Sequence, residues 1–205
     1  MKNDLVILLV FWVVMTATMI SMVSKTYDDS TMVDAAVEQP VVETVEEPLS
    51  PPVIFTDLGV PTNVDTSFKT YMDWRTVTDE TSNQYKLINT YGWHDEQGFM
   101  RVLGERDLGI TDDYYMIALG SYYGTKIGTK YRITTTEGNV FYGILSDCKD
   151  DRHTNSTHQY AQNKDVVEFL VDTRYLNSAV MRMGSANIYS PLRGAIAKIE
   201  RIDFK

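Results

Sequence analysis

Two carboxylic acids in the C-terminal half of the chain are placed where general acid–base chemistry could occur. Asp147 follows the apolar run 140–145 (VFYGIL), and Glu168 lies inside the run 166–171 (VVEFLV). Loss of water at the end of a buried strand, and a second carboxylate nearby, both raise the pKa of a carboxyl group toward neutrality. Such a group can protonate a leaving oxygen and later remove a proton from an attacking hydroxyl. The alternative is structural, with Asp147 capping a turn and Glu168 facing solvent.

A long polar segment, residues 150–164 (DDRHTNSTHQYAQNK), separates the two acids and adds further candidates. Its two histidines stand five positions apart beside carboxylates, a set that zinc could use, but the spacing is not a recognised ligand motif. We therefore expect no metal and no cofactor. The segment is better suited to contacting substrate, and two tyrosines before it could be stacking surfaces or packing residues. The candidate substrate-binding residues are His153, Thr154, His158, Gln159, Tyr122 and Tyr123.

Cys148 is the only cysteine, which excludes a disulfide framework and a cysteine-based zinc site. Its acidic neighbours Asp147 and Asp150 raise the pKa of a thiol, and Lys149 offsets them only in part, which argues against a nucleophilic cysteine. The glycines that precede the strongest strands form no phosphate-binding fingerprint. They are better explained by close backbone crossings in a small β fold.

Charge is distributed unevenly along the chain. The formal net charge is −9, and residues 26–66 carry nine acidic residues with no Lys or Arg. Residues 67–205 are nearly balanced, with 18 acidic and 17 basic residues. Nucleic-acid binding needs a basic face, so this balance argues against nucleic acid as a partner.

The N-terminal segment, residues 1–25, contains nineteen consecutive uncharged residues at 5–23. That length is enough to span a bilayer as a helix. We expect one transmembrane anchor, which places the chain at the cell membrane as a single-pass protein with an extracytoplasmic C-terminal domain. A cleaved signal peptide, which would make the domain secreted, is the main alternative.

Residues 26–65 carry five of the six prolines and repeated acidic residues. Charge repulsion and proline stiffness predict an extended, disordered linker. A short recognition segment at 53–55 is the alternative interpretation for part of it.

Residues 66–205 form the expected globular domain, in which short apolar runs alternate with turn residues. A turn containing Gly138 joins two of the runs into a hairpin. A short helix is expected at 177–183, ending at Gly184. Six or seven strands and no long helical period predict a mainly β domain, a small barrel with its core at about 112–205. The expected strands are 85–91, 98–103, 114–119, 130–135, 140–145, 166–171 and 195–202.

The order of motifs within 112–173 resembles a known superfamily. An apolar strand ends in Ala118-Leu119-Gly120, the segment 126–130 (KIGTK) leads into a second strand, a turn with Gly138 follows, and the third strand ends in Ser146-Asp147. This pattern is similar to the double-psi β-barrel superfamily, in particular the bacterial 3D domains and the rare-lipoprotein-A-like domains. The resemblance implies a six-stranded double-psi-type barrel.

The resemblance also implies a function in the bacterial cell wall. In catalytic members an aspartate at the third strand's end is the acid/base of a peptidoglycan lytic transglycosylase, and here that position is Asp147. Glu168 matches the second acidic position of the family. The chain departs from the pattern after Asp147, where Cys148-Lys149 replaces Thr-Gly, and in its long polar loop. The expected partners are peptidoglycan glycan strands and, through residues 5–23, the membrane. A non-catalytic glycan- or protein-binding module, or a structural component of the envelope, remains the alternative.

Overall fold

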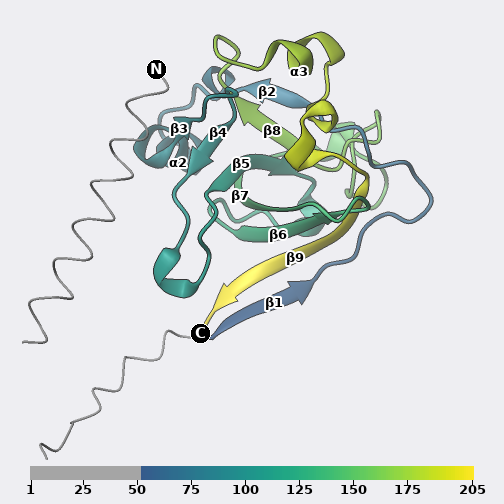
Figure 1. Ribbon diagram of the computed structural model, residues 1–205, viewed down its shortest axis with the longest axis horizontal. Helices are drawn as coiled ribbons and strands as arrows, with labels where there is room; N and C mark the ends of the chain where they lie inside the picture. The colour runs from purple at the N-terminus through teal and green to yellow at the C-terminus, as the bar shows by residue number, and fades with distance from the viewer. Residues whose placement is uncertain (1–51) are drawn as a thin grey trace, which may run out of the picture. The chain divides into compact units, whose positions relative to one another are not determined.

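The computed structural model describes residues 52–205 (Figure 1). The expected membrane anchor at 5–23 and most of the expected linker lie outside this range. Within 52–205 no helix combines the length and the apolar character needed to cross a bilayer.

The described chain contains nine strands, two α-helices and six short 3-10 helices. In order they are β1 (Val53–Asp57), β2 (Tyr71–Asp73), η1 (Trp74–Thr76), α2 (Asn83–Tyr91), β3 (Trp93–His94), β4 (Met100–Val102), η2 (Arg106–Leu108), β5 (Tyr114–Leu119), η3 (Ser121–Tyr123), β6 (Lys130–Thr135), β7 (Val140–Cys148), η4 (Asp151–His153), β8 (Glu168–Val171), α3 (Ser178–Met183), η5 (Ala186–Ile188), η6 (Ser190–Leu192) and β9 (Ile196–Phe204).

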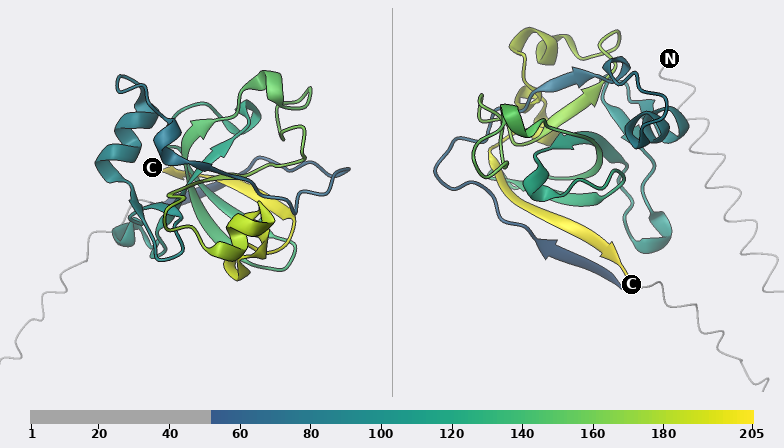
Figure 2. Two further views of the ribbon diagram at one scale, coloured as in Figure 1. Left: turned by 90° about the horizontal axis from the view of Figure 1, so that it is seen from above. Right: turned by 180° about the vertical axis from the view of Figure 1, so that it is seen from behind.

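The strands form one mixed sheet with the order β1-β9-β6-β7-β5-β4-β3, and β8 pairs with both β5 and β2. The pairing does not return to its start, so the expectation of a closed six-stranded barrel is wrong, whereas the mainly β class is confirmed. The physical reason is that β1 extends the sheet beyond β9, while β4 and β3 extend it beyond β5. Figures 1 and 2 show the sheet strongly curled, with β9 and β1 as a long ribbon along one side.

Strand β5 is the centre of the domain, and all six of its residues are buried. Its alternate side chains enter two separate clusters. Tyr115 and Ile117 pack with the larger core inside the curled sheet, whereas Met116 and Ala118 pack on the opposite face beneath α2. A strand covered on both faces reads as a continuous apolar run, which explains its sequence YYMIAL.

Seven expected segments have counterparts close to their predicted positions. The bounds of β5 and β6 are those predicted, and Gly138 in the β6–β7 turn has the positive φ of 82° that the turn requires. The expected helix at 177–183 is α3, which ends at Gly184 with a φ of 64°. Strands β4, β8 and β9 fall within two residues of their expected ranges, and β7 begins at Val140 as expected but continues to Cys148.

Residues 85–91 form most of helix α2, so the prediction of a strand there is wrong. The Ser82 hydroxyl accepts a hydrogen bond from the backbone N–H of Tyr85 at 3.1 Å and caps the helix start. Ile88 is buried in the cluster on the outer face of β5, with Leu87 packed against it. Burial of one helix face against the sheet therefore outweighs the strand preference of the residues.

Strand β1 lies inside the range expected to be a disordered linker, so the folded domain begins earlier than residue 66. All five residues of β1 pair with β9 in antiparallel register, from Val53 with Phe204 to Asp57 with Glu200. Phe55 packs against the outer cluster, and the guanidinium of Arg132 lies 3.8 Å from its ring centroid. The apolar residues 53–55 thus serve as an edge strand.

Candidate functional site

A β-bulge directs the Asp147 side chain away from the core. Leu145 and Asp147 are two residues apart, so a regular strand would turn both to the same face. The register between β5 and β7 shifts here: Leu145 pairs with Ile117, but the next residue of β5, Ala118, pairs with Asp147. Leu145 consequently packs in the inner core and Asp147 joins the row of Ala118 on the α2 face.

Glu168 reaches the same row from the other edge of β5. It pairs with Ala118 in the antiparallel β5–β8 ladder, and directly paired residues project from the same face of a sheet. Asp147 and Glu168 therefore flank Ala118 on one face, with their backbones separated by two strand spacings, about 10 Å. The structure thus brings the two predicted catalytic carboxylates onto one face and separates them by one strand.

The surroundings of Asp147 favour its protonated form. Burial is the largest influence and raises the pKa of Asp147 above its ordinary value. Hydrogen bonds from the Cys148 backbone N–H, at 2.9 Å, and from the Gln84 side chain of α2 lower the pKa in part, as does the charge of Lys149. The expected desolvation at this strand end is present.

Glu168 does not fill the role expected of it as a companion charge for Asp147. The groups that shift the pKa of Asp147 do not include Glu168. The side chain of Glu168 is one-quarter exposed, and its Oε2 lies 3.5 Å from Nζ of Lys149. The reason is geometric, because Ala118 and its strand stand between the two acids.

A polar cavity of about 200 Å³ is lined in part by Glu168, and Asp147 does not line it. Lys149 and Asp165 form a nearly fully buried ion pair in its wall, with Nζ 2.8 Å from Oδ2. The sequence reasoning named neither residue as part of a site. The sequence did contain one signal for an ion pair: Lys149 directly follows β7, and the oppositely charged Asp165 shortly precedes β8. The side chains that give the cavity its polar character are Thr70, Lys149, Asp150, His153, Asn163, Asp165 and Glu168.

Of the residues expected to contact substrate, only His153 lines this cavity. Thr154, His158 and Gln159 instead stabilise the loop itself. The Thr154 hydroxyl and Nδ1 of His158 are hydrogen-bonded at 2.9 Å, and the Gln159 backbone N–H donates to Oδ1 of Asn155 at 2.7 Å. These contacts give the loop a defined path over the end of β5, and the structure does not place the three residues with His153 in the cavity.

The two tyrosines expected as stacking surfaces differ in their exposure. Tyr123 is 2% exposed and belongs to the inner core, so the packing interpretation holds for it and a stacking role is excluded. Tyr122 is half exposed, and its hydroxyl donates to the Leu58 carbonyl at 3.1 Å. It does not line the polar cavity.

No group of three or more His, Cys, Asp or Glu side chains between residues 52 and 205 is arranged to hold a metal ion. His158 lies 3.5 Å from Oδ1 of Asp151, an isolated pair that does not form a metal site. For Cys148, burial is the largest cause that raises the thiol pKa, followed by the charges of Asp147 and Asp151. The thiol is therefore poorly suited to act as a nucleophile.

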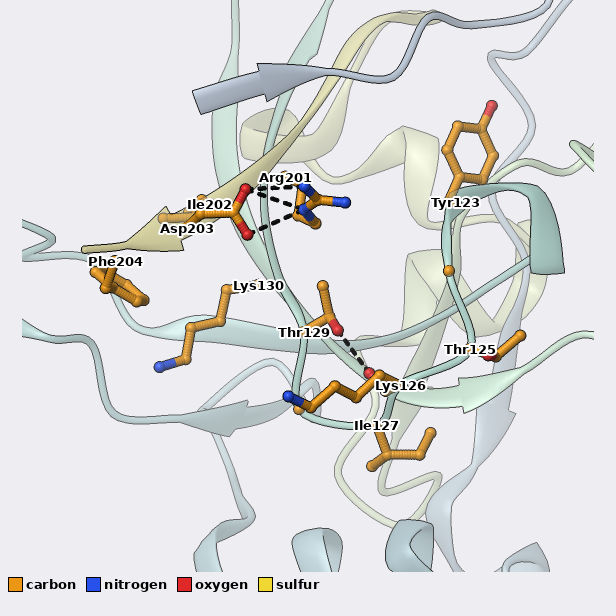
Figure 3. Close-up of a pocket in the computed structure, with 12 residues that line it drawn as sticks. Tyr123, Thr125, Lys126, Ile127, Thr129, Lys130, Arg201, Ile202, Asp203 and Phe204 are labelled. Carbon is orange, nitrogen blue, oxygen red and sulfur yellow. Dashed lines mark hydrogen bonds and ion pairs between the residues drawn. The ribbon is translucent and has the colours of Figure 1, made fainter. Parts of the chain in front are cut away.

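A second hollow, of about 560 Å³, lies between the loop before β6 and the end of β9 (Figure 3). Its cations are largely engaged: Arg201 binds Asp203 at 3.0 Å, and Lys130 forms an ion pair with Glu105. Figure 3 shows Lys126 on the loop with the Arg201–Asp203 pair across the hollow. Apart from the buried Tyr123, none of the site residues expected from the sequence lines this hollow.

No protein family, curated protein or solved structure matches the chain.

Proposed function

We propose that the domain acts on the glycan strands of peptidoglycan, as a lytic transglycosylase-like enzyme with Asp147 as its acid/base. The observation that carries this proposal is the partly buried Asp147 carboxyl, which the bulge in β7 turns to the outer face and which burial shifts toward the protonated form. The motif order of residues 112–173, similar to double-psi barrels of the 3D type, supports the same reaction class.

The chemistry needs one carboxyl group in two roles. The protonated Asp147 gives its proton to the glycosidic oxygen while the bond from that oxygen to the anomeric carbon breaks, and the leaving sugar keeps the bonding electrons. The Asp147 carboxylate then removes the proton of the primary hydroxyl, whose oxygen attacks the anomeric carbon and closes an anhydro ring. The carboxyl is thereby restored, and no water is consumed.

Glu168 contributes to sugar binding in this scheme. A hydrolytic reaction would use two carboxyl groups flanking the scissile bond, with their separation setting the stereochemistry. Asp147 and Glu168 do share one face, but Lys149 already contacts Glu168 and makes it less free to activate water. We therefore favour the single-carboxyl reaction.

The test is release of soluble muropeptides from purified sacculi by the full chain, analysed for anhydro ends. We expect product from the wild type and none from Asp147→Asn. Asp203→Asn is the matched control, because Asp203 lies on β9 in an exposed ion pair with Arg201. Equal release by Asp147→Asn and the wild type would disprove the assignment.

A non-catalytic glycan-binding module is the second candidate, favoured by the buried Lys149–Asp165 pair in the cavity wall. A binding module would sediment with sacculi in a pull-down without releasing product. The Asp147→Asn variant would sediment to the same extent as the wild type.

The membrane location is part of the proposal. The uncharged run 5–23 would anchor the chain and place the domain next to the wall. Cell fractionation tests it: we expect the full chain in the membrane fraction and a variant lacking residues 1–25 outside that fraction. Recovery of the full chain in the soluble fraction of the cytoplasm would contradict it.

A further inference from the structure

The polar cavity beside Glu168 contains a buried carboxylate oxygen without a partner. Asp165 is fully buried, and its Oδ2 accepts hydrogen bonds from Nζ of Lys149 and from the Thr70 hydroxyl. The other oxygen, Oδ1, is buried and has no hydrogen-bond partner within residues 52–205. Buried carboxylate oxygens are almost always hydrogen-bonded, so Oδ1 of Asp165, a residue that lines the cavity, lacks a donor that a water molecule or a ligand hydroxyl would supply.

The polar groups around the cavity are of both kinds. Lys149 offers N–H donors, whereas Asp165 and Glu168 offer acceptors. The amide of Asn163 and the ring of His153 can each donate and accept. A phosphate would need donors alone, and a metal ion would need acceptors without an ammonium group among them. A mixed lining matches hydroxyl groups, each of which donates and accepts.

Size and charge narrow the ligand further. A cavity of about 200 Å³ is smaller than sites for drug-sized molecules, which begin at roughly 300 Å³, so it holds a single ring and not an extended ligand. The lining carries the carboxylates of Asp150, Asp165 and Glu168 and one ammonium group, that of Lys149, which contacts both Asp165 and Glu168. Arg152 binds Asp150, so the charge that remains in the cavity is negative. An anionic ligand is therefore disfavoured, and an uncharged ligand that carries hydroxyl groups is accommodated.

We propose that this cavity binds one pyranose ring of a glycan, with a ring hydroxyl donating to Oδ1 of Asp165. Lys149 donates to a ring oxygen, and His153 and Asn163, which are both exposed, contact the ring from the mouth of the cavity. The inference rests on the proposed function for the identity of the glycan. It adds a sugar subsite that is lined by Glu168 and not by Asp147, the carboxyl that does the chemistry.

The experiment is a calorimetric titration of the full chain with a trimer of N-acetylglucosamine. Inorganic phosphate and a lysine-containing tripeptide are titrated in parallel. The same titrations in the Asp147→Asn background prevent turnover from obscuring binding. We expect saturable binding of the trimer and no binding of phosphate or the tripeptide. The affinity for the trimer should be at least tenfold weaker in Asp165→Asn and in His153→Ala, and unchanged in Asp203→Asn. His153→Ala keeps the test valid if Asp165→Asn fails to fold, because His153 is exposed.

Failure of this inference and failure of the proposed function give different results. Trimer binding that depends on Asp165 and His153, in a protein that releases nothing from sacculi, supports the subsite and rejects the enzyme. Release from sacculi with equal trimer affinity in Asp165→Asn, His153→Ala and the wild type overturns the subsite alone. Absence of trimer binding, or preference for phosphate or the peptide, also overturns it.

Discussion

Asp147 and Glu168 pair with the same residue, Ala118, from opposite edges of β5. The relationship depends on the bulge in β7, where Ser146 has no pairing partner on β5. The bulge moves Asp147 from the core face to the α2 face. Without that shift the carboxyl would point into the inner cluster, where neither solvent nor substrate reaches it. The bulge is thus the feature that makes an acid/base role for Asp147 sterically reasonable.

The first prediction concerns the stability cost of Asp147. Because burial raises its pKa, the folded protein holds the Asp147 proton to a higher pH than the unfolded chain does, and stability decreases as the pH rises through the folded pKa. Asp147→Asn removes this cost and should stabilise the domain at neutral pH by on the order of 1 kcal/mol. Urea unfolding at pH 7 and at pH 3 measures it.

The gain from Asp147→Asn should be largest at neutral pH and should shrink at acidic pH, where the wild-type carboxyl is protonated in both states. Asp203→Asn, the exposed control, should show no such gain. A variant that is less stable than the wild type at pH 7 would mean that the hydrogen bonds from Cys148 and Gln84 outweigh the burial of the charge.

The second prediction concerns Gly120, where the polar loop crosses the end of β5. A Cβ at this position would overlap the carbonyl oxygen of His158, although the backbone of Gly120 is itself extended. Gly120→Ala should therefore displace the loop and cost roughly 1–3 kcal/mol. Trypsin cleavage at Arg152, which is exposed on the loop, should become faster.

Gly109→Ala is the control for this variant. No atom lies near the added methyl at Gly109, and only the positive φ of 79° is unfavourable. It should lower the melting temperature slightly without accelerating cleavage at Arg152. Unchanged cleavage in Gly120→Ala would mean that the loop accommodates the methyl group without moving.

The strands that carry the site could be predicted because their signals are local. Strands β5 and β6 are apolar or alternating runs bounded by glycine, and the β6–β7 turn carries its positive φ at Gly138. Helix α2 was missed because YKLINTY is rich in strand-type residues, although Ser82 provided a capping signal. Strand β1 was missed because its acidic and proline-rich surroundings dominated the composition.

The site itself depends on contacts between distant segments. The register shift of β5 against β7 decides which face Asp147 occupies, and no local pattern encodes a parallel register. The buried Asp165 of the Lys149–Asp165 pair likewise accepts a hydrogen bond from Thr70, 95 residues away in the sequence. Sequence could therefore name Asp147 and Glu168 as acids at strand ends but could not predict Asp165 or the cavity that it lines.

The third prediction concerns Glu200, which joins β9 to β6. Its side chain is 5% exposed and accepts a hydrogen bond from Nε of Arg132 at 2.7 Å, and the two residues are direct partners in the ladder. Arg132 holds the pKa of Glu200 at about 2, below the ordinary 4.5. The resulting stability is fully present above pH 4.5 and is lost as the pH falls toward 2.

Glu200→Gln should lower the free energy of unfolding at pH 7 by about 1–2 kcal/mol, since Arg132 is one-third exposed and its interaction is partly screened. Denaturant curves at several pH values should show the difference between the variant and the wild type vanishing near pH 2. A difference that persists at that pH would assign the loss to packing and not to charge.

The fourth prediction concerns Lys69, whose side chain is fully buried. Its ammonium donates to three neutral oxygens, the Gly194 carbonyl at 2.5 Å, Oδ1 of Asn187 at 3.0 Å and the Ser67 carbonyl at 3.2 Å. Burial lowers the pKa of Lys69 to about 8 from its ordinary 10.5. Between these values the folded protein has released a proton that the unfolded chain still binds, so stability should rise with pH.

Lys69→Met removes this titration and leaves the three oxygens unsatisfied, so the variant should be less stable than the wild type by roughly 1–3 kcal/mol near pH 8. The gap should widen as the pH rises from about 8 to 10.5, because only the wild type gains stability over that window. Comparing the two proteins at each pH cancels the contribution of the buried tyrosines, which titrate in both. A gap that stays constant across the window would show that Lys69 keeps its proton in the folded domain and acts only as a hydrogen-bond donor.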